Sequence, residues 1–286
     1  MLGKDEREER AAEVETFYTK SPFPGYAADD DGPAILDRCR KNPFTESMHR
    51  AIPPDADVLD IGTGTAQIPA YLALAGPRRR VFGVDGCRMS LTHAEEFRSR
   101  AKLDNLQLVR GDIFDLPIEP GSFPIVLSRG VVHHTPDPDL AIAKVAACVA
   151  PGGVLVLGYY ETMGRAFHCF RRGLSKLTGK PIRALDPVLR RSDLEEEKKR
   201  IWIDDQYNHP LEHILPTPHV VRVLDKLGFR TERTVPPAAP GATLFDPSSL
   251  PGPAGLFLRR LGWMATGLNN PDAGLVCVVA RRQDRA

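Results

Sequence analysis

The sequence predicts an α/β protein built on a doubly wound, mostly parallel sheet with helices on both faces. Short apolar runs alternate with stretches of helical periodicity along the chain up to about residue 160. The predicted strands are almost continuously apolar, which is typical of parallel strands buried on both faces. A chain of 286 residues with 42% hydrophobic residues is also long enough to bury a sizeable core.

Seven apolar runs are the predicted strands. They span residues 57–61, 81–85, 106–112, 124–130, 154–160, 229–235 and 274–281. Helical patterns begin near residue 65 and cover residues 89–102. A third helix is expected from Asp137, because Asp followed by Pro138 is typical of an N-cap and first turn. A fourth ends at Gly228, a residue type that favours helix C-termini.

Two long pieces interrupt this order, at residues 161–216 and 236–272. Pieces of that length in a compact sheet domain are usually binding or covering segments, and we expect helix near 193–204 and 254–267. The predicted organisation therefore has four parts. These are an N-terminal helical lid (1–44), a sheet core (45–160), a substrate cover (161–216), and the end of the sheet (217–286) with a Pro-rich insertion at 236–272.

Composition narrows the classes of partner. With 38 Lys and Arg against 37 Asp and Glu, the net charge of +1 makes nucleic acid an unlikely partner. No apolar run approaches the length of a membrane span, and the charged N-terminus is unlike a secretory signal. The five cysteines form no C-x-x-C pair and suggest neither a disulfide framework nor a zinc site. We expect a cytoplasmic protein with no membrane partner and no metal.

The strongest chemical signal is the turn after the first strand, VLDIGTGTAQ. Gly62 and Gly64 let the backbone approach a ligand closely ahead of a helix N-terminus. This pattern alone also fits dinucleotide enzymes, but Gln67 stands where their third glycine would be. Asp60 is an anion suited to a cationic group and unsuited to a pyrophosphate.

Two further aspartates follow the next two strands. Asp85 ends the second strand, where a carboxylate is placed to accept hydrogen bonds from a ribose diol. Asp112 follows the third strand, where it is placed to accept from an adenine amine with Ile113 against the ring. Each aspartate taken alone is more often a turn or cap residue. Their occurrence in order, one at each strand end, favours a nucleoside-binding site.

At this point the chain resembles a known family. The segments DIGTGTAQ, VFGVDG, GDIFDLP, SRGVVHH and APGGVLVLGYY, in this order, look like the class I S-adenosylmethionine-dependent methyltransferases, and the small-molecule methyltransferase-11 type is the most similar. The resemblance is close over residues 45–160 and looser afterwards. It implies a Rossmann-like sheet of order 3-2-1-4-5-7-6 with an antiparallel last strand. It also implies S-adenosylmethionine as the cofactor and S-adenosylhomocysteine as the product.

The resemblance implies roles for individual residues. The glycine turn would hold the methionine part, the second strand end the ribose, the third the adenine, and the fourth the wall beside the sulfonium. The implied cofactor residues are Asp60, Gly62, Thr63, Gly64, Asp85, Gly86, Asp112, Ile113, Ser128, Arg129 and Gly130. Pro124 departs from the family, which usually has an acidic residue there, and we expect it at a strand start or a bulge.

Acceptor residues are expected near the fourth and fifth strand ends and in the covers. His133 and His209 are candidate general bases. Candidate substrate-binding residues are Tyr18, Tyr26, His134, Tyr159, Tyr160 and Tyr207. Simpler alternatives remain: the two histidines are polar residues that enter the next helix, residues 202–213 form a solvated helix end stopped by Pro210, and residues 16–26 only staple the N-terminal helix.

The predicted function is methyl transfer to an O, N or C atom of a small-molecule acceptor. The sulfonium methyl is already activated, so the protein has mainly to align the acceptor and exclude water, and no metal is required. Two alternatives stay open: a protein or RNA methyltransferase that uses the long segments for docking, and a cofactor-binding fold without methyl transfer. The chain is expected to be a monomer or a homodimer.

Overall fold

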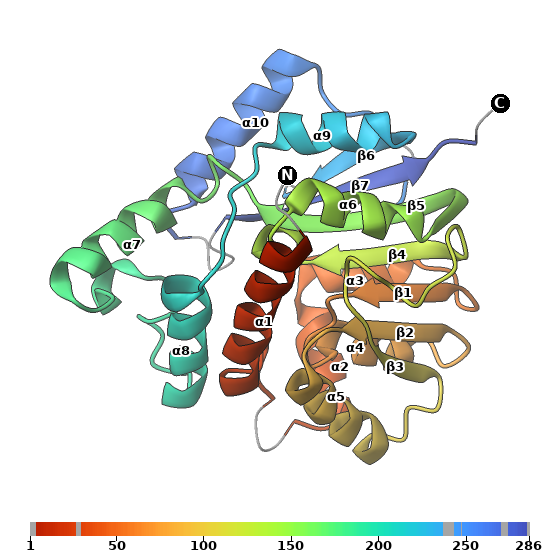
Figure 1. The fold of residues 1–286 in the computed structure, drawn as a ribbon, viewed down its shortest axis with the longest axis horizontal. Coiled ribbons are helices and arrows are strands. Elements are labelled where there is room, and N and C mark those ends of the chain that lie inside the picture. Colours follow the sequence, from red (N-terminus) through yellow and green to blue (C-terminus); the bar gives the residue numbers. More distant parts are fainter. Residues whose placement is uncertain (1–3, 27–29, 237–242, 247, 270–273, 285–286) are drawn as a thin grey trace.

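The computed structural model describes residues 4–26, 30–236, 243–246, 248–269 and 274–284, and they build one seven-stranded sheet between layers of helices (Figure 1). Its strand order is β3-β2-β1-β4-β5-β7-β6, with β7 antiparallel to both neighbours, as the family resemblance implied. The strands are β1 Asp57–Ile61, β2 Arg80–Asp85, β3 Leu106–Arg110, β4 Phe123–Arg129, β5 Val149–Tyr160, β6 Phe229–Val235 and β7 Leu275–Arg282.

The predicted strands are confirmed, with one difference in length. β5 begins at Val149, before the Pro-Gly-Gly break that was expected to separate helix from strand, because Val149 already pairs with Phe123. The register then shifts between Phe123 and Ile125. Pro124, which has no N–H to donate, lies within this irregularity, as expected for a proline near a strand start.

Strand side chains alternate between two separate cores. Val58 packs with α2 Gly32–Lys41, α3 Pro43–Ala51, α4 Gln67–Ala75 and α5 Arg88–Arg100 on one face. Leu59, the next residue, packs with α6 Pro138–Ala147 and α9 Thr217–Lys226 on the other. Asp137 caps α6 by accepting from the Leu140 N–H, as predicted.

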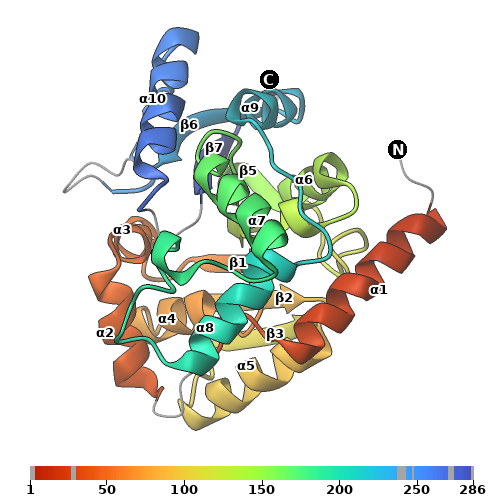
Figure 2. The same cartoon turned by 90° about the vertical axis from the view of Figure 1, so that its left-hand side faces the viewer.

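The long segment after β5 stays at the carboxyl edge of the sheet. It contains α7 Ala166–Thr178, a short turn η2 Arg183–Leu185, α8 Glu196–Ile203 and a π-helical turn η3 Asp204–Asn208. It then returns along β5, where the Leu215 N–H donates to the Tyr160 carbonyl at 2.9 Å. In Figure 2, which looks onto this edge, α7 and α8 lie in front of the strands and the N-terminal helix α1 Lys4–Lys20 lies beside them.

Helices α8 and α10 Pro253–Thr266 fall where helix was expected, whereas α7 was not predicted. Of the Pro-rich stretch 236–272, residues 237–242, 247 and 270–272 lie outside the described residues. The division into four parts stays a prediction, and its first boundary at residue 44 falls inside α3.

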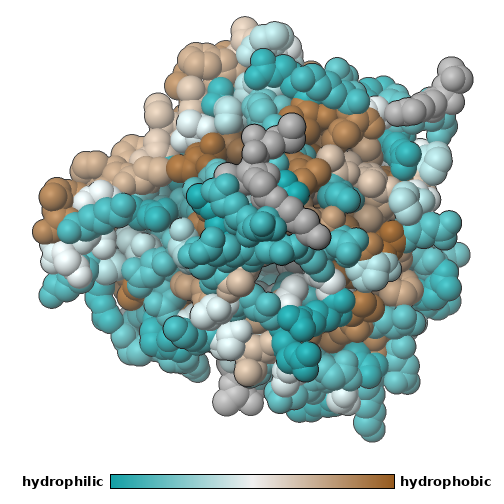
Figure 3. All heavy atoms as spheres, in the orientation of Figure 1, coloured by the Kyte–Doolittle hydropathy of each residue, from teal (hydrophilic) through white to brown (hydrophobic). Residues whose placement is uncertain are grey.

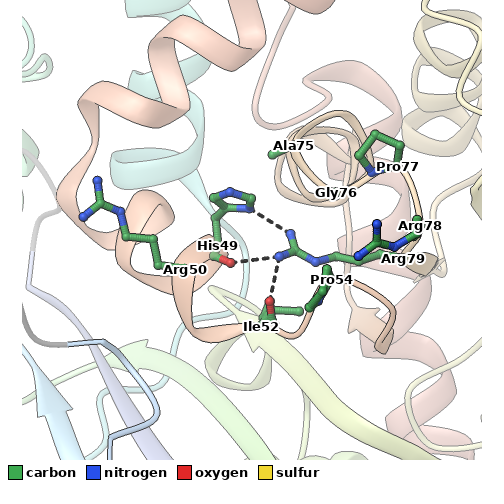
Figure 4. Close-up of a pocket in the computed structure, with 9 residues that line it drawn as sticks. All are labelled: His49, Arg50, Ile52, Pro54, Ala75, Gly76, Pro77, Arg78 and Arg79. Carbon is green, nitrogen blue, oxygen red and sulfur yellow. Dashed lines mark hydrogen bonds between the residues drawn. The ribbon is translucent and has the colours of Figure 1, made fainter.

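The opposite, amino edge of the sheet is fastened by a buried arginine. The Arg79 guanidinium donates to the carbonyls of His49 and Ile52 at 2.9 and 2.7 Å and lies 2.8 Å from His49 Nδ1 (Figure 4). Its Nε also donates to the Pro53 carbonyl at 3.0 Å. These bonds tie the end of α3 to the turn before β2. A cavity of about 320 Å³ lies beside them, on the far edge from the glycine turn.

Replacing Arg79 by lysine should lower the free energy of unfolding by about 2–4 kcal/mol, because the single ammonium nitrogen cannot reach all the acceptors that Nε, Nη1 and Nη2 of the guanidinium contact separately. Urea denaturation followed by circular dichroism measures this change. Arg78→Lys is the matched control, since Arg78 is exposed and adjacent. Equal stability of the two variants would contradict the assigned role of Arg79.

Candidate functional site

The turn after β1 is shaped by positions that exclude side chains. Gly62 and Gly64 have φ of +75° and +56°. The Gly62 N–H donates to the Val84 carbonyl at 2.8 Å, which holds the turn against β2. A Cβ on Gly62 would lie 2.2 Å from Val131 Cγ2, so this position requires glycine for space as well as for φ.

Asp85 fixes the same turn from the end of β2. Its Oδ2 accepts from the Gly64 N–H at 2.7 Å and its Oδ1 accepts from the Cys87 N–H at 2.8 Å. Burial raises the pKa of the Asp85 carboxyl, and these two backbone hydrogen bonds act in the opposite direction. The neighbouring Gly86 is exposed. Asp85 therefore organises the glycine turn while it faces the same edge.

Two buried polar groups lie at the ends of β1 and β4. The Asp60 side chain is 6% exposed, and burial raises the pKa of its carboxyl to about 7. The Ser128 hydroxyl is fully buried, and within the described part of the chain no group bonds to it. Because Asp60 is in register with Leu127, Ser128 lies one residue further along the neighbouring strand. Buried polar side chains are normally hydrogen-bonded, so a buried hydroxyl without a protein partner is suited to contact a polar ligand.

The other expected cofactor residues lie at the same edge in varied environments. Asp112 is exposed, and its Oδ1 accepts from the Phe114 N–H at 2.9 Å, which is the turn-residue role named as its alternative. Ile113 packs on the core beneath it. The Arg129 guanidinium lies 5.4 Å from the Phe44 ring centroid. Gly130 has a φ of +81° and open space where a Cβ would be.

Residues 21–26 lie directly on the glycine turn. A Cβ on Gly64 would lie 2.3 Å from the carbonyl oxygen of Phe23. The Tyr26 hydroxyl donates to the Thr65 carbonyl at 2.8 Å, and the Gln67 amide donates to the Gly25 carbonyl at 3.1 Å. Gln67, the residue that replaces the third glycine of a dinucleotide motif, thus helps to hold this segment.

The end of α1 and the π-helical turn η3 meet above this segment. Ser21 donates to Asp204 Oδ2 at 2.6 Å, and the Tyr18 hydroxyl lies 3.4 Å from Asp205 Oδ1. The Phe17 and His209 rings lie 4.8 Å apart. Residues 16–26 and 204–209, distant in sequence, therefore close the carboxyl edge together.

Beneath η3 lies a buried polar cluster that extends from the end of β5. The Arg165 guanidinium lies 3.4 Å from the Tyr160 ring centroid and pairs with Glu212. Gln206 accepts from Arg165 Nη1 at 2.8 Å and donates to the Tyr160 hydroxyl at 2.6 Å. Gln206 also donates to Asp205 Oδ2 at 2.6 Å. Burial raises the pKa of the Asp205 carboxyl to about 6.

Three histidine rings adjoin this cluster. His133 lies 4.0 Å from the Tyr160 ring and 4.2 Å from His134, which lies 3.8 Å from His209. Burial lowers the pKa of His134 to about 3 and that of His209 to about 2, and lowers that of His133 well below its usual value. Among the described groups neither ring nitrogen of His133 has a partner. These rings are therefore neutral at physiological pH and are weak bases.

Some expected substrate residues do not face this cluster. The Tyr159 hydroxyl donates to Thr217 Oγ1 at 2.9 Å within the α9 core, because side chains alternate along β5 and only Tyr160 turns to the histidines. Glu161, expected on the pocket floor, accepts from Arg260 Nε at 2.6 Å. Tyr207 donates to Asp186 Oδ2 at 2.7 Å, on the α7 side of η3.

His133 and His134 lie in a 3-10 turn, Val132–His134, just before α6, so they do enter the next helix as the simpler alternative had it, but as buried residues. The solvated helix end named as the alternative for residues 202–213 does not describe Asp205 and His209, which are buried. Arg165 and Gln206 were missed as site residues. The density of titratable residues in 202–213 pointed to the right segment, but no sequence signal marked Arg165. Within the described ranges, no three His, Cys, Asp or Glu side chains are placed to bind a metal, and no helix is long and apolar enough to cross a bilayer.

Comparisons agree with this geometry. Residues 59–157 match the family model described as a methyltransferase domain. The trans-aconitate 2-methyltransferase of Deinococcus radiodurans is 34% identical over 115 residues, 40% of this chain and 42% of that protein. The demethylmenaquinone methyltransferase of Staphylococcus carnosus is 32% identical over 116 residues, 40% of this chain and 46% of that protein. The matched stretch thus spans less than half of each relative.

Among solved structures, PKMT2 from Rickettsia typhi in complex with AdoHcy is similar in fold. The TM-score is 0.56 at 17% sequence identity, and the similarity covers 92% of this chain and 55% of that one.

Gly64→Ala should displace residues 21–26, because the new Cβ would overlap the Phe23 carbonyl oxygen. Hydrogen exchange across residues 16–26 should accelerate by about 5–150-fold, in line with a local cost of about 1–3 kcal/mol. Gly130→Ala is the control, since its φ is also positive but a Cβ there meets nothing within 4 Å. Unchanged exchange in the Gly64 variant would mean that the segment does not rest on the turn.

Proposed function

Because the chain carries a class I S-adenosylmethionine-dependent methyltransferase domain, we propose that it transfers a methyl group from this cofactor to a small-molecule acceptor. One observation carries the proposal. The glycine turn, the Asp85 carboxylate that holds it, and buried Asp60 and Ser128 converge at one edge of the sheet, beneath a cover. Ligands of open α/β sheets bind at this edge.

The residues at this edge fit the cofactor's chemistry. The carboxyl of Asp60, whose pKa is raised to about 7 by burial, would gain from a nearby ammonium, such as that of the methionine part. Each oxygen of Asp85 accepts one backbone hydrogen bond and retains capacity for a ribose hydroxyl. Ser128 would supply the hydroxyl beside the sulfonium. When bound, the cofactor supplies a methyl group on a positively charged sulfur.

The cover supports a small acceptor rather than a protein or RNA chain. Tyr18 and Ser21 contact η3 directly, so the acceptor side is enclosed by α1 and the segment after β5. A polymer would need an open mouth beside the glycine turn. The two curated relatives named above are methyltransferases of trans-aconitate and demethylmenaquinone, which is consistent with a small acceptor here. In this proposal the acceptor atom is an O, N or C that carries a proton, which is lost on methylation.

The proton of such an acceptor needs a base whose pKa lies near the working pH. The depressed pKa values of His133 and His209 make them poor bases, so we assign them to orienting the acceptor by hydrogen bonds. Asp205 is the better base: burial raises the pKa of its carboxyl to about 6, and its Oδ1 faces the Tyr18 hydroxyl. Exclusion of water by the cover would strengthen the hydrogen bonds of the histidines and of Asp205 to the acceptor.

Asp85→Asn should weaken binding of S-adenosylhomocysteine by at least about tenfold, since a charge-assisted hydrogen bond contributes about 1.5–3 kcal/mol. Calorimetry measures the affinity, with NAD as a ligand expected to bind weakly or not at all. Asp104→Asn is the control, because Asp104 is exposed in the turn before β3. An unchanged dissociation constant in the folded variant would remove Asp85 from the site.

Asp205→Asn should slow methyl transfer by roughly 10²–10⁴-fold with cofactor affinity unchanged. In the unmodified protein kcat/KM should rise with pH through about 6, as Asp205 ionises, and this limb should vanish in the variant. Formation of S-adenosylhomocysteine from a panel of hydroxyl, amine and enol metabolites supplies the assay. Asp193→Asn is the control, because Asp193 is exposed and pairs with Arg191 away from this cluster. An Asp205→Asn variant that keeps the acidic limb would refute Asp205 as the base.

A further inference from the structure

Exposed hydrophobic side chains are concentrated on one side of the molecule. Of the nine large hydrophobic side chains exposed in the described chain, seven lie on or beside α7, η2 and α10, and only Met89 and Val109 lie elsewhere. The seven are Phe170, Leu177, Leu185, Phe257, Leu258, Met264 and Leu268. Single exposed apolar residues are ordinary, but a concentration of this kind marks an interaction surface.

The seven residues lie on or beside three elements on the same side of the molecule. Phe170 and Leu177 are seven positions apart on α7, as are Phe257 and Met264 on α10, so each pair shares a helix face. The Arg171 guanidinium donates to the carbonyls of both Leu185 and Leu268 at 3.2 Å, which joins the three elements. Figure 1 shows α7 at the far left and α10 above it at the upper left, and Figure 3 shows hydrophobic residues along that upper left side.

The unpaired charge of this face is positive. Between Glu161 and Asp186 the chain carries six Arg and Lys and no acidic residue, and residues 248–269 carry two Arg and no acidic residue. Of these cations Arg165 and Arg171 are buried, Arg172 pairs with Glu212, Arg260 pairs with Glu161, and Arg183 pairs with the exposed Glu196 of α8. Lys176 and Lys180 are exposed, and no ion pair joins either to another described residue.

We propose that the face formed by α7, η2 and α10 docks on an anionic lipid bilayer. Helices that combine exposed Phe and Leu with Lys and Arg bind at the headgroup boundary. Leu177 is 85% exposed and Leu258 is 65% exposed, so both project far enough to enter the acyl boundary without a shape-matched partner. This proposal departs from the expectation of no membrane partner, which rested on the lack of an apolar run long enough to span a bilayer; docking on the bilayer surface requires no such run.

A second copy of the chain fits this face less well. A two-fold dimer places a patch against itself, which would bring Lys176 and Lys180 of both copies together. An acidic protein would satisfy the charge but would need pockets for side chains that project from two separate helices. The lipid surface satisfies the charge and accepts the projecting side chains.

The face also adjoins the candidate acceptor site. α7 begins one residue after Arg165, and its buried side contributes His168, whose Nε2 donates to the Gln206 carbonyl at 2.9 Å. A docked molecule would therefore present the wall of the polar cluster towards the bilayer. If the proposed function holds, this placement favours acceptors that partition into membranes; the docking itself does not depend on methyl transfer.

The test is flotation of the full-length protein with vesicles of phosphatidylcholine containing 30% phosphatidylglycerol, and with phosphatidylcholine alone. We expect binding to the anionic vesicles, weakened by salt. The double variant Leu177→Glu/Leu258→Glu should lower partitioning by at least about tenfold, since anions replace inserted side chains. Lys176→Gln/Lys180→Gln should lower it by about fivefold for each lysine, at about 1 kcal/mol per charge.

Met89→Glu/Val109→Glu is the matched control, because these residues are 39% and 38% exposed on other elements. It should bind as the unmodified protein does, and circular dichroism verifies that every variant is folded. The proposal is overturned by absence of vesicle binding, by equal binding to neutral vesicles, or by equal loss in the control. It is also overturned by a dimer in light scattering that Leu177→Glu dissociates, or by an acidic protein that occupies the face instead.

Discussion

The approach of the Phe23 backbone to Gly64 is the contact that links the glycine turn after β1 to the segments that cover it. It requires a residue without a side chain, and the Asp85 carboxylate holds that residue by its N–H. Once residues 21–26 rest on the turn, Tyr18 and Ser21 face η3 and the cover is closed. The same glycine that allows close approach to a ligand therefore also sets the position of the N-terminal segment.

The polar cluster under the cover illustrates the cost of such a site. Burying Arg165 with Glu212 removes two charges from water, and their attraction offsets this only with additional hydrogen bonds. Gln206 provides them by contacting Arg165, Tyr160 and Asp205 together. Asp205 has no comparable cation in direct contact among its described partners, which is why burial raises its pKa towards neutrality. A cluster optimised only for stability would replace these groups with apolar ones.

The fold could be predicted from sequence because it depends on local patterns. Apolar strands, the Asp137–Pro138 cap and the ordered strand-end motifs each report on a few neighbouring residues, and all seven strands follow from them. The positions expected to bind the cofactor could likewise be placed at the carboxyl ends of strands, while their contacts with a ligand stay a prediction. The acceptor side was not, because it depends on how a 56-residue segment returns to β5, and on a π-helical turn that points Asp205 and Gln206 inward. Because side chains alternate along β5, Tyr159 and Tyr160 face opposite sides of the sheet. Which of the two faces the histidines depends on the register of the strand.

Helix α7, which the sequence analysis did not predict, contributes to both the polar cluster and the exposed hydrophobic surface. Its inner side supplies His168 to the cluster, and its N-terminal neighbour Arg165 supports Tyr160. Its outer side carries Phe170 and Leu177 into solvent. A helix packed on one side against a buried polar cluster gains little hydrophobic stabilisation from that side, so its exposed apolar residues are not explained by folding. They are explained if the outer side of α7 is buried against a binding partner when the protein acts. Because α7 also adjoins the polar cluster, the surface on which the protein docks would then influence which acceptors reach the site.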